Sequence, residues 1–295
     1  MNHTDTPLAD PERDVLAEVV DTGRHHLTED VATWRALGHE LSGQLAHDGI
    51  AKLPGFLRPS AVDAIADEFD RLRSWVPMVR DRRSVYAGST AGPEQGHPAL
   101  HVESEWVAGH ITRDMIPPQS PAHRLYVSPM FKQLVAACVA AEQLFEYADP
   151  LAGLVATVLA PGGCYGWHYD TNEYVVTVSI CDAEQGGDFE YCRDLRRPGD
   201  ENLDGLAAVL SGADRASVSS ASTSPGDLQV FRGRYSLHRV TRVSGARHRV
   251  VLVLSYSDRA GVIGPIDRTR RVYGRVTEAH LVAGSARCGA DGLIL

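Results

Sequence analysis

The chain has 295 residues and a formal net charge of −9 at pH 7. That length suits one large domain or two small ones, and its 43% hydrophobic and 23% charged residues exclude a disordered, collagen-like or coiled-coil chain. The negative charge argues against general binding to nucleic acid or to an anionic membrane, because both require a cationic face.

Cysteine usage and the N-terminal sequence indicate a cytoplasmic protein. The five cysteines are odd in number and show no C-x-x-C spacing, so neither a disulfide framework nor a zinc ribbon is indicated. The N-terminus is polar and acidic, unlike a signal peptide, and no apolar run is long enough to span a membrane. We therefore expect a protein of a reducing compartment that has no membrane association.

The sequence of the first half of the chain predicts mainly helices and irregular segments. Residues 1–26 are polar and are expected to form a flexible arm. Residues 77–127 are rich in arginine, proline and glycine and are expected to form a long irregular loop. The other expected elements are a helix over 29–47 capped by Thr28, a strand at 50–53, a helix capped by Ser60, and a helix that begins at Ser128-Pro129.

After Tyr147 the pattern changes to short β-rich runs separated by turn residues. The runs are 154–159, 167–170, 174–180, 188–191, 227–231 and 250–256, with a helical insert at 201–210 and a Ser/Ala-rich loop at 216–224. Successive strands without long intervening helices predict an antiparallel sandwich or barrel. We expect a mainly β (α+β) fold in one domain over 27–275, with helical support over 27–146, a β core at about 147–258 and a tail at 276–295.

The β core contains the motif His168-Tyr169-Asp170, and a further histidine, His238, follows much later. Alternating residues of a strand point to one face, so His168 and Asp170 can direct an imidazole and a carboxylate toward one metal ion. His238 from another strand would complete a set of two histidines and one carboxylate. That set leaves coordination positions open and is typical of non-haem Fe(II) sites.

Two other segments have a similar spacing. His3-Thr-Asp5 lies in the expected arm, where no preformed site can exist, and is discarded. His101-Val-Glu103 lies in the expected loop, where the alternation of a strand is not assured, and is kept as an alternative metal pair. Only His168 and Asp170 combine a strand context with a later histidine at a strand edge.

Arg247 and Arg249 lie two residues apart where the last strand begins, so they share one face close to His238. A guanidinium there can hold the distal carboxylate of a dicarboxylate cosubstrate through two parallel hydrogen bonds. Taken alone, the pair could equally be a solvated strand end. Its place beside the metal motif favours the binding role.

Together these residues resemble the Fe(II)/2-oxoglutarate-dependent dioxygenases, and in particular the bacterial subgroup of free-amino-acid hydroxylases and halogenases. The resemblance covers roughly residues 145–275 and includes Tyr147-Ala-Asp-Pro-Leu151, Gly186-Gly-Asp-Phe-Glu190, Pro225-Gly-Asp-Leu228, Phe231-Arg-Gly-Arg234 and His238-Arg-Val-Thr241. It implies a double-stranded β-helix of the jelly-roll, cupin-like type, with Fe(II), 2-oxoglutarate and O2 as cofactor and cosubstrates. The implied iron ligands are His168, Asp170 and His238. Arg249, which directly precedes the strand, is preferred over Arg247 for 2-oxoglutarate.

The resemblance also implies a reaction. Halogenases of the subgroup have a small residue in place of the metal-binding carboxylate, whereas this chain has Asp170, which favours oxygen transfer over chloride binding. We therefore expect hydroxylation of a C–H bond in a small free amino acid or a derivative, in secondary metabolism. Desaturation or ring formation at the same iron centre stays open. So does a non-catalytic, cupin-like protein that binds a metal or ligand, although the arginine pair argues against it.

Substrate contacts are less well marked, and the oligomeric state is not indicated. Arg80, Arg82 and Arg83 are candidates for a substrate carboxylate, and Asp149 or Glu173 for an ammonium group. Each is more often a solvated charge. A nucleic-acid substrate is disfavoured by the net charge of −9.

Overall fold

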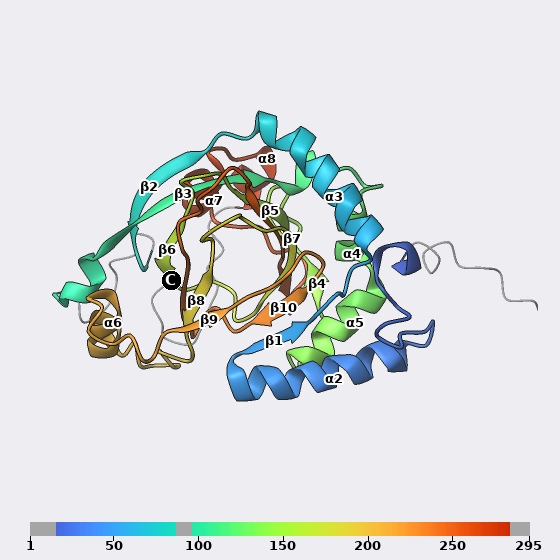
Figure 1. The fold of residues 1–295 in the computed structure, drawn as a ribbon, viewed down its shortest axis with the longest axis horizontal. Coiled ribbons are helices and arrows are strands. Elements are labelled where there is room, and N and C mark those ends of the chain that lie inside the picture. The colour runs from blue at the N-terminus through green and yellow to red at the C-terminus, as the bar shows by residue number, and fades with distance from the viewer. Residues whose placement is uncertain (1–15, 87–95, 284–295) are drawn as a thin grey trace, which may run out of the picture.

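The computed structural model describes residues 16–86 and 96–283, which form two main antiparallel sheets and a two-stranded one, with helices packed against the largest sheet (Figure 1). The larger sheet contains β1 (Ile50–Leu53), β2 (Val79–Ser84), β3 (Glu103–Ile111), β5 (Leu154–Leu159), β7 (Val175–Cys181), β10 (Leu228–Phe231) and β12 (Arg249–Leu254). The smaller sheet contains β6 (Tyr165–His168), β8 (Phe189–Cys192), β9 (Ser219–Ala221) and β11 (Leu237–Val240), and β4 (Phe145–Glu146) pairs with β13 (Tyr256–Ser257). The helices are α2 (Val31–Asp48), α3 (Pro59–Leu72), α4 (Pro121–Val127), α5 (Pro129–Cys138), α6 (Leu203–Leu210), α7 (Ile266–Tyr273) and α8 (Glu278–Ala283), and single 3-10 turns form η1 (Arg73–Trp75), η2 (Pro98–His101) and η3 (Arg113–Met115).

The strand order confirms the expected jelly roll. The larger sheet has the order β1-β10-β7-β12-β5-β3-β2, and the smaller sheet has the order β6-β11-β8-β9. Between β5 and β12 the chain alternates between the two sheets, except that β8 and β9 both belong to the smaller one, as in a double-stranded β-helix with one added strand. The inner faces contact each other, since the Phe231 ring of β10 lies 4.9 Å from the His238 ring of β11 and 5.0 Å from the Phe189 ring of β8, measured between centroids.

Alternation along β12 separates the helix-facing side of the larger sheet from its inner side. Val250, Leu252 and Leu254 are buried in the main apolar cluster with side chains of α2, α3 and α5. A fully buried side chain of this size stabilises the fold by about 2 kcal/mol relative to an exposed one. Arg249 and Val251 therefore point the other way, into the space between the sheets. In Figure 1, helices α2 to α5 cover one side of the larger sheet, and α6 lies at the opposite end of the molecule.

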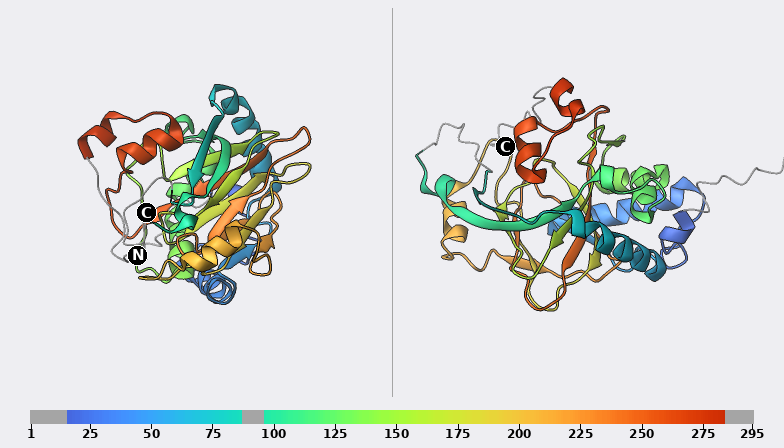
Figure 2. Two further views of the ribbon diagram at one scale, coloured as in Figure 1. Left: turned by 90° about the vertical axis from the view of Figure 1, so that its left-hand side faces the viewer. Right: turned by 90° about the horizontal axis from the view of Figure 1, so that it is seen from above.

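The packed part of the chain is longer at both ends than expected. Leu16, Val19 and Val20 are buried in the main cluster, so the expected arm is packed from residue 16 onward, while residues 1–15 lie outside the described residues. Within the expected tail, α8 is packed through His280, which is fully buried. Figure 2 shows α7 and α8 together on one side of the molecule, away from α2.

Two of the three expected helix starts are shifted in the structure. Asp30, not Thr28, caps α2, because its Oδ1 accepts a hydrogen bond from the amide of Ala32 over 2.9 Å. The second helix starts at Pro59, one residue before Ser60. The expected third helix is confirmed, since Ser128 Oγ accepts from the amide of Phe131 at the start of α5.

The prediction of a long loop over residues 77–127 is wrong, because this segment contains β2, β3 and α4. The β2 sequence Val-Arg-Asp-Arg-Arg-Ser lacks apolar alternation, so its strand character depends on its partner strand. Arg80 forms an ion pair with Glu105 of β3, and Arg82 Nε lies 3.5 Å from Glu103 Oε2. Such cross-strand pairs stabilise an exposed edge strand. The expected loop at 216–224 likewise contains the short strand β9.

Within the described ranges, none of the helices combines the length and the apolar character that crossing a membrane requires.

Candidate metal centre

Strands β6 and β11 are neighbours in the smaller sheet and carry the two histidines of the motif. His168 pairs directly with His238, but Tyr165 pairs with Val240, so β6 has one extra residue between the two pairs. This bulge turns both Tyr165 and His168 inward and Trp167 outward, where it packs with α6. The strand ends at His168, two residues earlier than expected, and Asp170 follows directly after it.

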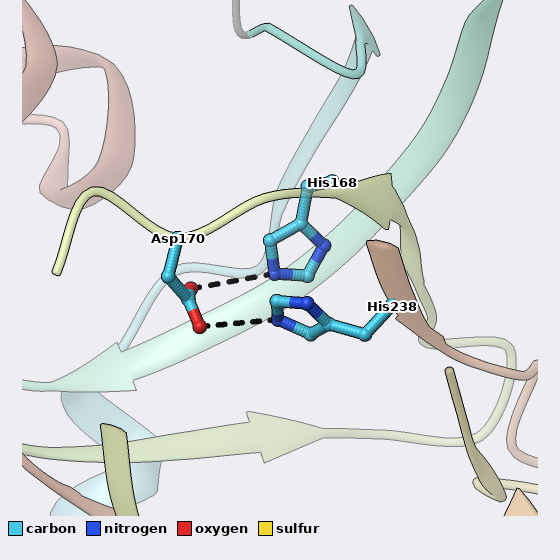
Figure 3. Close-up of side chains that lie close together, drawn as sticks. All are labelled: His168, Asp170 and His238. Atoms are coloured by element: carbon cyan, nitrogen blue, oxygen red, sulfur yellow. Dashed lines mark ion pairs between the residues drawn. The ribbon is translucent and has the colours of Figure 1, made fainter. Parts of the chain in front are cut away.

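The three side chains of the motif converge between the sheets (Figure 3). His168 Nε2 lies 3.8 Å from Asp170 Oδ1, and His238 Nε2 lies 3.2 Å from Asp170 Oδ2. One donor atom from each residue lies within 4.8 Å of the others, and no other group of three or more such residues occurs in residues 16–86 and 96–283. These donor atoms are close enough to share one ion.

Both imidazoles are oriented by backbone carbonyl groups. His168 Nδ1 lies 2.8 Å from the carbonyl oxygen of Gly166, and His238 Nδ1 lies 2.9 Å from that of Ser236. Each Nδ1–H therefore donates to the backbone, which leaves each Nε2 lone pair directed at the shared site. This tautomer is the one a metal ligand needs.

The charge states also suit a cation. Burial, together with the neighbouring His238 ring, lowers the pKa of His168 to about 3. Burial opposes ionisation of Asp170, but His238, His168 and Arg268 outweigh it and hold the pKa of the carboxyl at about 2. At neutral pH His168 is therefore neutral and Asp170 is ionised, the forms that bind a divalent metal. This donor set fits Fe(II).

Arg249 lies on the inner face of the larger sheet and has no fixed partner. Its guanidinium forms no hydrogen bond or ion pair with the residues that the structure describes. Burial lowers the pKa of Arg249 to about 10, while Asp182 and Asp188 act in the opposite direction, so the group stays charged at neutral pH. A half-buried cation without a partner in the described ranges fits a carboxylate ligand such as the distal group of 2-oxoglutarate. Arg247 is exposed, which favours Arg249 as expected.

Comparison with known proteins assigns the chain to a family. The model of the family described as Halogenase D matches residues 34–271, which include the three metal-binding candidates and Arg249. The chain belongs to the halogenase D family. No protein with a curated description matches the sequence.

Solved structures are similar to this halogenase D family member, and the similarity to AviO1 extends to the fold. AviO1 from Streptomyces viridochromogenes Tue57 is 18% identical, with a TM-score of 0.51, and the match covers 80% of this chain and 98% of that one. A 2OG-Fe(II) oxygenase family oxidoreductase from Burkholderia pseudomallei is 16% identical (TM-score 0.47), with 76% of this chain and 92% of that chain covered. A prolyl-4-hydroxylase from Pseudomonas putida is 17% identical (TM-score 0.49), with coverages of 76% and 100%.

The family, the jelly roll and the cluster of two histidines and one aspartate agree with one another. They confirm the resemblance expected from the sequence: this halogenase D family member is an Fe(II)- and 2-oxoglutarate-dependent oxygenase. Position 170 of the cluster carries a carboxylate, that of Asp170.

The alternative metal pair is not assembled. His101 and Glu103 belong to no group of three potential ligands in the described ranges, and Glu103 faces Arg82 on the exposed strand edge. His3 and Asp5 lie outside the described residues.

The three arginines of β2 separate into two outward and one inward side chain. Arg80 and Arg82 are exposed and pair with glutamates of β3. Arg83 is 9% exposed, lies 2.7 Å from Asp81 Oδ2, and stacks over Trp106 with its Cζ 4.9 Å from the ring centroid. The Trp106 ring lies 4.7 Å from the His168 ring, so only Arg83 of the three approaches the metal centre.

The two acidic candidates for a substrate ammonium group are engaged elsewhere. Asp149 is fully buried and accepts hydrogen bonds from the amides of Leu151, Ala152 and Gly264, with His280 Nε2 at 3.0 Å from its Oδ2. It therefore stabilises the packing of the C-terminal segment and is inaccessible to a substrate. Glu173 Oε1 lies 3.6 Å from Arg232 Nη2 at the surface.

Two features near the metal centre were missed in the sequence. His110 of β3 is hydrogen-bonded to the Tyr165 hydroxyl and packs edge-on against Tyr273 of α7, with 5.6 Å between ring centroids. Arg268, also on α7, lies close enough to lower the pKa of both His168 and Asp170. His110 was missed because it lies in the segment 77–127, where a loop and not a strand was expected. The signal for α7 was Pro265 followed by an amphipathic run.

Proposed function

We propose that this oxygenase hydroxylates a C–H bond of a small free amino acid or a derivative, in the cytoplasm and within secondary metabolism. The observation that carries the proposal is the pairing of a three-ligand site with an unpaired inward arginine. His168, Asp170 and His238 would hold Fe(II), and Arg249 would hold the distal carboxylate of 2-oxoglutarate. A protein that only stores a metal ion has no use for the arginine.

The cofactor and the protein have separate tasks in this reaction. Iron held by His168, Asp170 and His238, together with 2-oxoglutarate and O2, would supply the oxidising power for C–H hydroxylation. The overall change converts the substrate C–H, O2 and 2-oxoglutarate into C–OH, succinate and CO2. The protein supplies the orientation: the carbonyls of Gly166 and Ser236 fix the two imidazoles, and the inner face of the larger sheet fixes Arg249.

Asp170 supports oxygen transfer over halogenation. Its carboxylate lies against both Nε2 atoms, where it would take the position that chloride needs in a halogenase. Desaturation or ring formation would use the same residues, and the product decides between these outcomes. Mass analysis of the product distinguishes them, because hydroxylation adds one oxygen atom and the other two reactions remove two hydrogen atoms.

Arg268 supports a substrate with a carboxylate. The side chain is exposed, its charge reaches the metal centre, and it has no hydrogen-bond or ion-pair partner in the described ranges. Tyr273, on the same helix, packs against His110, which fixes α7 next to β3. An Arg268→Gln variant is expected to raise the KM for the amino acid at least tenfold with unchanged iron binding. The matched control is Arg270→Gln, an exposed arginine of the same helix.

The proposal is tested under anaerobic conditions. Fe(II) and then 2-oxoglutarate are added, and a weak visible charge-transfer band is expected when both bind at the centre. A panel of free amino acids is then added, and a shift of the band identifies the substrate. A band that no amino acid shifts would move the substrate to a larger or carrier-bound molecule. A folded, metal-loaded protein without a band would instead support the cupin-like binding protein.

A further inference from the structure

Tyr169 lies between two candidate metal ligands but points away from the metal. Its ring packs against a second apolar cluster on the outer side of the smaller sheet, which includes Tyr86, Trp167, Leu206 and Leu237. Its hydroxyl oxygen is buried without a hydrogen-bond partner in the described part of the chain. The position of Tyr169 therefore depends on contacts of its ring and not on its hydroxyl group.

The main polar contact of that ring is a buried arginine. The Arg196 side chain is 1% exposed, and its Cζ lies 3.9 Å from the centroid of the Tyr169 ring. A buried cation is costly unless it is paired. Arg196 Nη1 lies 3.1 Å from Glu201 Oε2, and its Nε donates to the carbonyl oxygen of Arg234 over 2.7 Å. Glu201 in turn accepts a hydrogen bond from the Tyr86 hydroxyl over 3.0 Å.

The backbone next to Tyr169 is joined to the same region. The amide of Asp170 donates to the carbonyl oxygen of Gly233 over 3.0 Å. Arg234 Nη1 donates to the carbonyl oxygen of Thr171 over 3.1 Å. Residues 169–171 are thus held against residues 233–234 on both sides of Asp170, and Arg196 contacts both segments.

The segment that carries Arg196 also reaches the other strand of the metal centre. The amide of Asp194 donates to Ser236 Oγ over 3.1 Å, and the carbonyl oxygen of Ser236 accepts from His238 Nδ1. Ser236 is fully buried, so this link is shielded from water. One loop after β8 therefore supports the backbone of Asp170 and the orientation of His238.

We propose that Arg196 is a positioning residue of the metal centre, which acts by stacking on Tyr169 and so fixes the backbone that carries His168 and Asp170. The inference rests on the proposed iron site. A ligand carboxylate must stay within a few tenths of an ångström of its place, and loss of a group that supports a ligand typically weakens metal binding about 10–100-fold.

Substitutions of Tyr169 separate the ring from the hydroxyl. Tyr169→Phe keeps the face on which Arg196 stacks, and Tyr169→Leu removes it. The affinity for Fe(II) is measured anaerobically, and the affinity for Co(II) is measured from its visible absorption, without substrate or turnover. Tyr169→Phe is expected to bind both metals within twofold of wild type, and Tyr169→Leu at least tenfold more weakly. Equal affinity in the two variants would overturn the proposal.

Substitutions of Arg196 test the cation itself. Arg196→Met alone removes the cation that pairs with the half-buried Glu201, so the double variant Arg196→Met/Glu201→Gln is made beside it. Each is expected to bind Co(II) at least tenfold more weakly, with a changed absorption band because the carboxylate is displaced. The control is Arg58→Met, since Arg58 Nε donates to the carbonyls of Ala17 and Val20 instead.

The control separates positioning from general instability. Arg58→Met is expected to lower the melting temperature and to leave the Co(II) affinity unchanged. An equal loss of affinity in Arg58→Met, or wild-type affinity in both Arg196 variants, would overturn the positioning role and leave the proposed function intact. A wild-type protein that binds neither Fe(II) nor Co(II) would overturn the proposed function, and this inference with it.

Discussion

The amide of Asp170 donates a hydrogen bond to the carbonyl oxygen of Gly233, and a Cβ atom on residue 233 would overlap the Asp170 carboxylate. The absence of a side chain at this position is therefore part of the metal centre. The space that a side chain would occupy is filled by the carboxylate that we propose as a metal ligand.

A Gly233→Ala variant is expected to displace the Asp170 carboxylate and to weaken Fe(II) binding at least tenfold. The measurement is an anaerobic Fe(II) titration. Gly43→Ala is the control, because no atom lies within 4 Å of a Cβ at this exposed position of α2. It should raise the free energy of unfolding by about 1 kcal/mol with unchanged iron affinity. Tight iron binding by Gly233→Ala would show that Asp170 is not a ligand.

Arg249 and Arg247 are expected to differ strongly in their effect on 2-oxoglutarate. Arg249 faces inward without a partner in the described ranges, and Arg247 is exposed. Arg249→Ala should raise the KM for 2-oxoglutarate about 100-fold, as expected for loss of a charge-assisted contact of about 3 kcal/mol. Arg247→Ala should change it less than threefold. The reverse order in steady-state kinetics would refute the assignment.

Removing the carboxylate of Asp170 should open a position on the metal. Asp170→Gly is expected to lose hydroxylation and to bind chloride, because a small residue leaves room for an anion beside the two histidines. Chloride is titrated into the anaerobic variant loaded with Fe(II) and 2-oxoglutarate, and the charge-transfer band is followed. The wild-type band should not respond to chloride. Unchanged hydroxylation without any chloride effect would contradict the ligand role of Asp170.

Strand patterns predicted that His168, Asp170 and His238 come together, and the structure brings these three side chains within reach of one ion. β5 forms at the expected residues, and β12 begins one residue before the expected run, at Arg249. The bulge in β6 could not be foreseen, since it depends on the register with β11. His168 and Asp170 meet through this bulge and the following turn, and not through simple alternation along one strand.

The missed elements are those whose stability comes from tertiary contacts. β2 consists mostly of charged residues and forms through cross-strand ion pairs with β3, which local propensity does not encode. From the sequence, Asp149 was expected to be a solvated acid. Its burial depends on contact with His280, which lies 131 residues away in the sequence. Arg268 was missed for the same reason, because α7 lies beyond the expected β core.

Asp149 is expected to serve stability and not substrate binding. Asp149→Ala leaves the amides of Leu151, Ala152 and Gly264 without their acceptor, which should lower the free energy of unfolding by about 3 kcal/mol or more. The measurement is urea unfolding. At a temperature where the variant is folded, its affinity for Fe(II) and its KM for the amino acid should match wild type. A raised KM at full stability would restore Asp149 as a substrate contact.

His110 should make the metal-free protein less stable in mild acid. Burial, with the nearby Arg83, lowers the pKa of His110 from 6.5 to about 4. The folded state therefore keeps this imidazole neutral while the unfolded chain takes up a proton. Its contribution to stability is complete above about pH 6.5 and is lost as the pH falls from there toward 4.

The effect is measured by urea unfolding of the metal-free protein at pH 7.5 and pH 5. The free energy of unfolding is expected to fall between pH 7.5 and pH 5. In His110→Asn this fall should be smaller than in wild type by roughly 1–2 kcal/mol. His168 titrates in the same direction in both proteins, so comparing the two slopes isolates the contribution of His110. Equal losses in wild type and variant would mean that His110 is protonated in the folded state. The hydrogen bond between His110 and the Tyr165 hydroxyl would then have the imidazole as its donor.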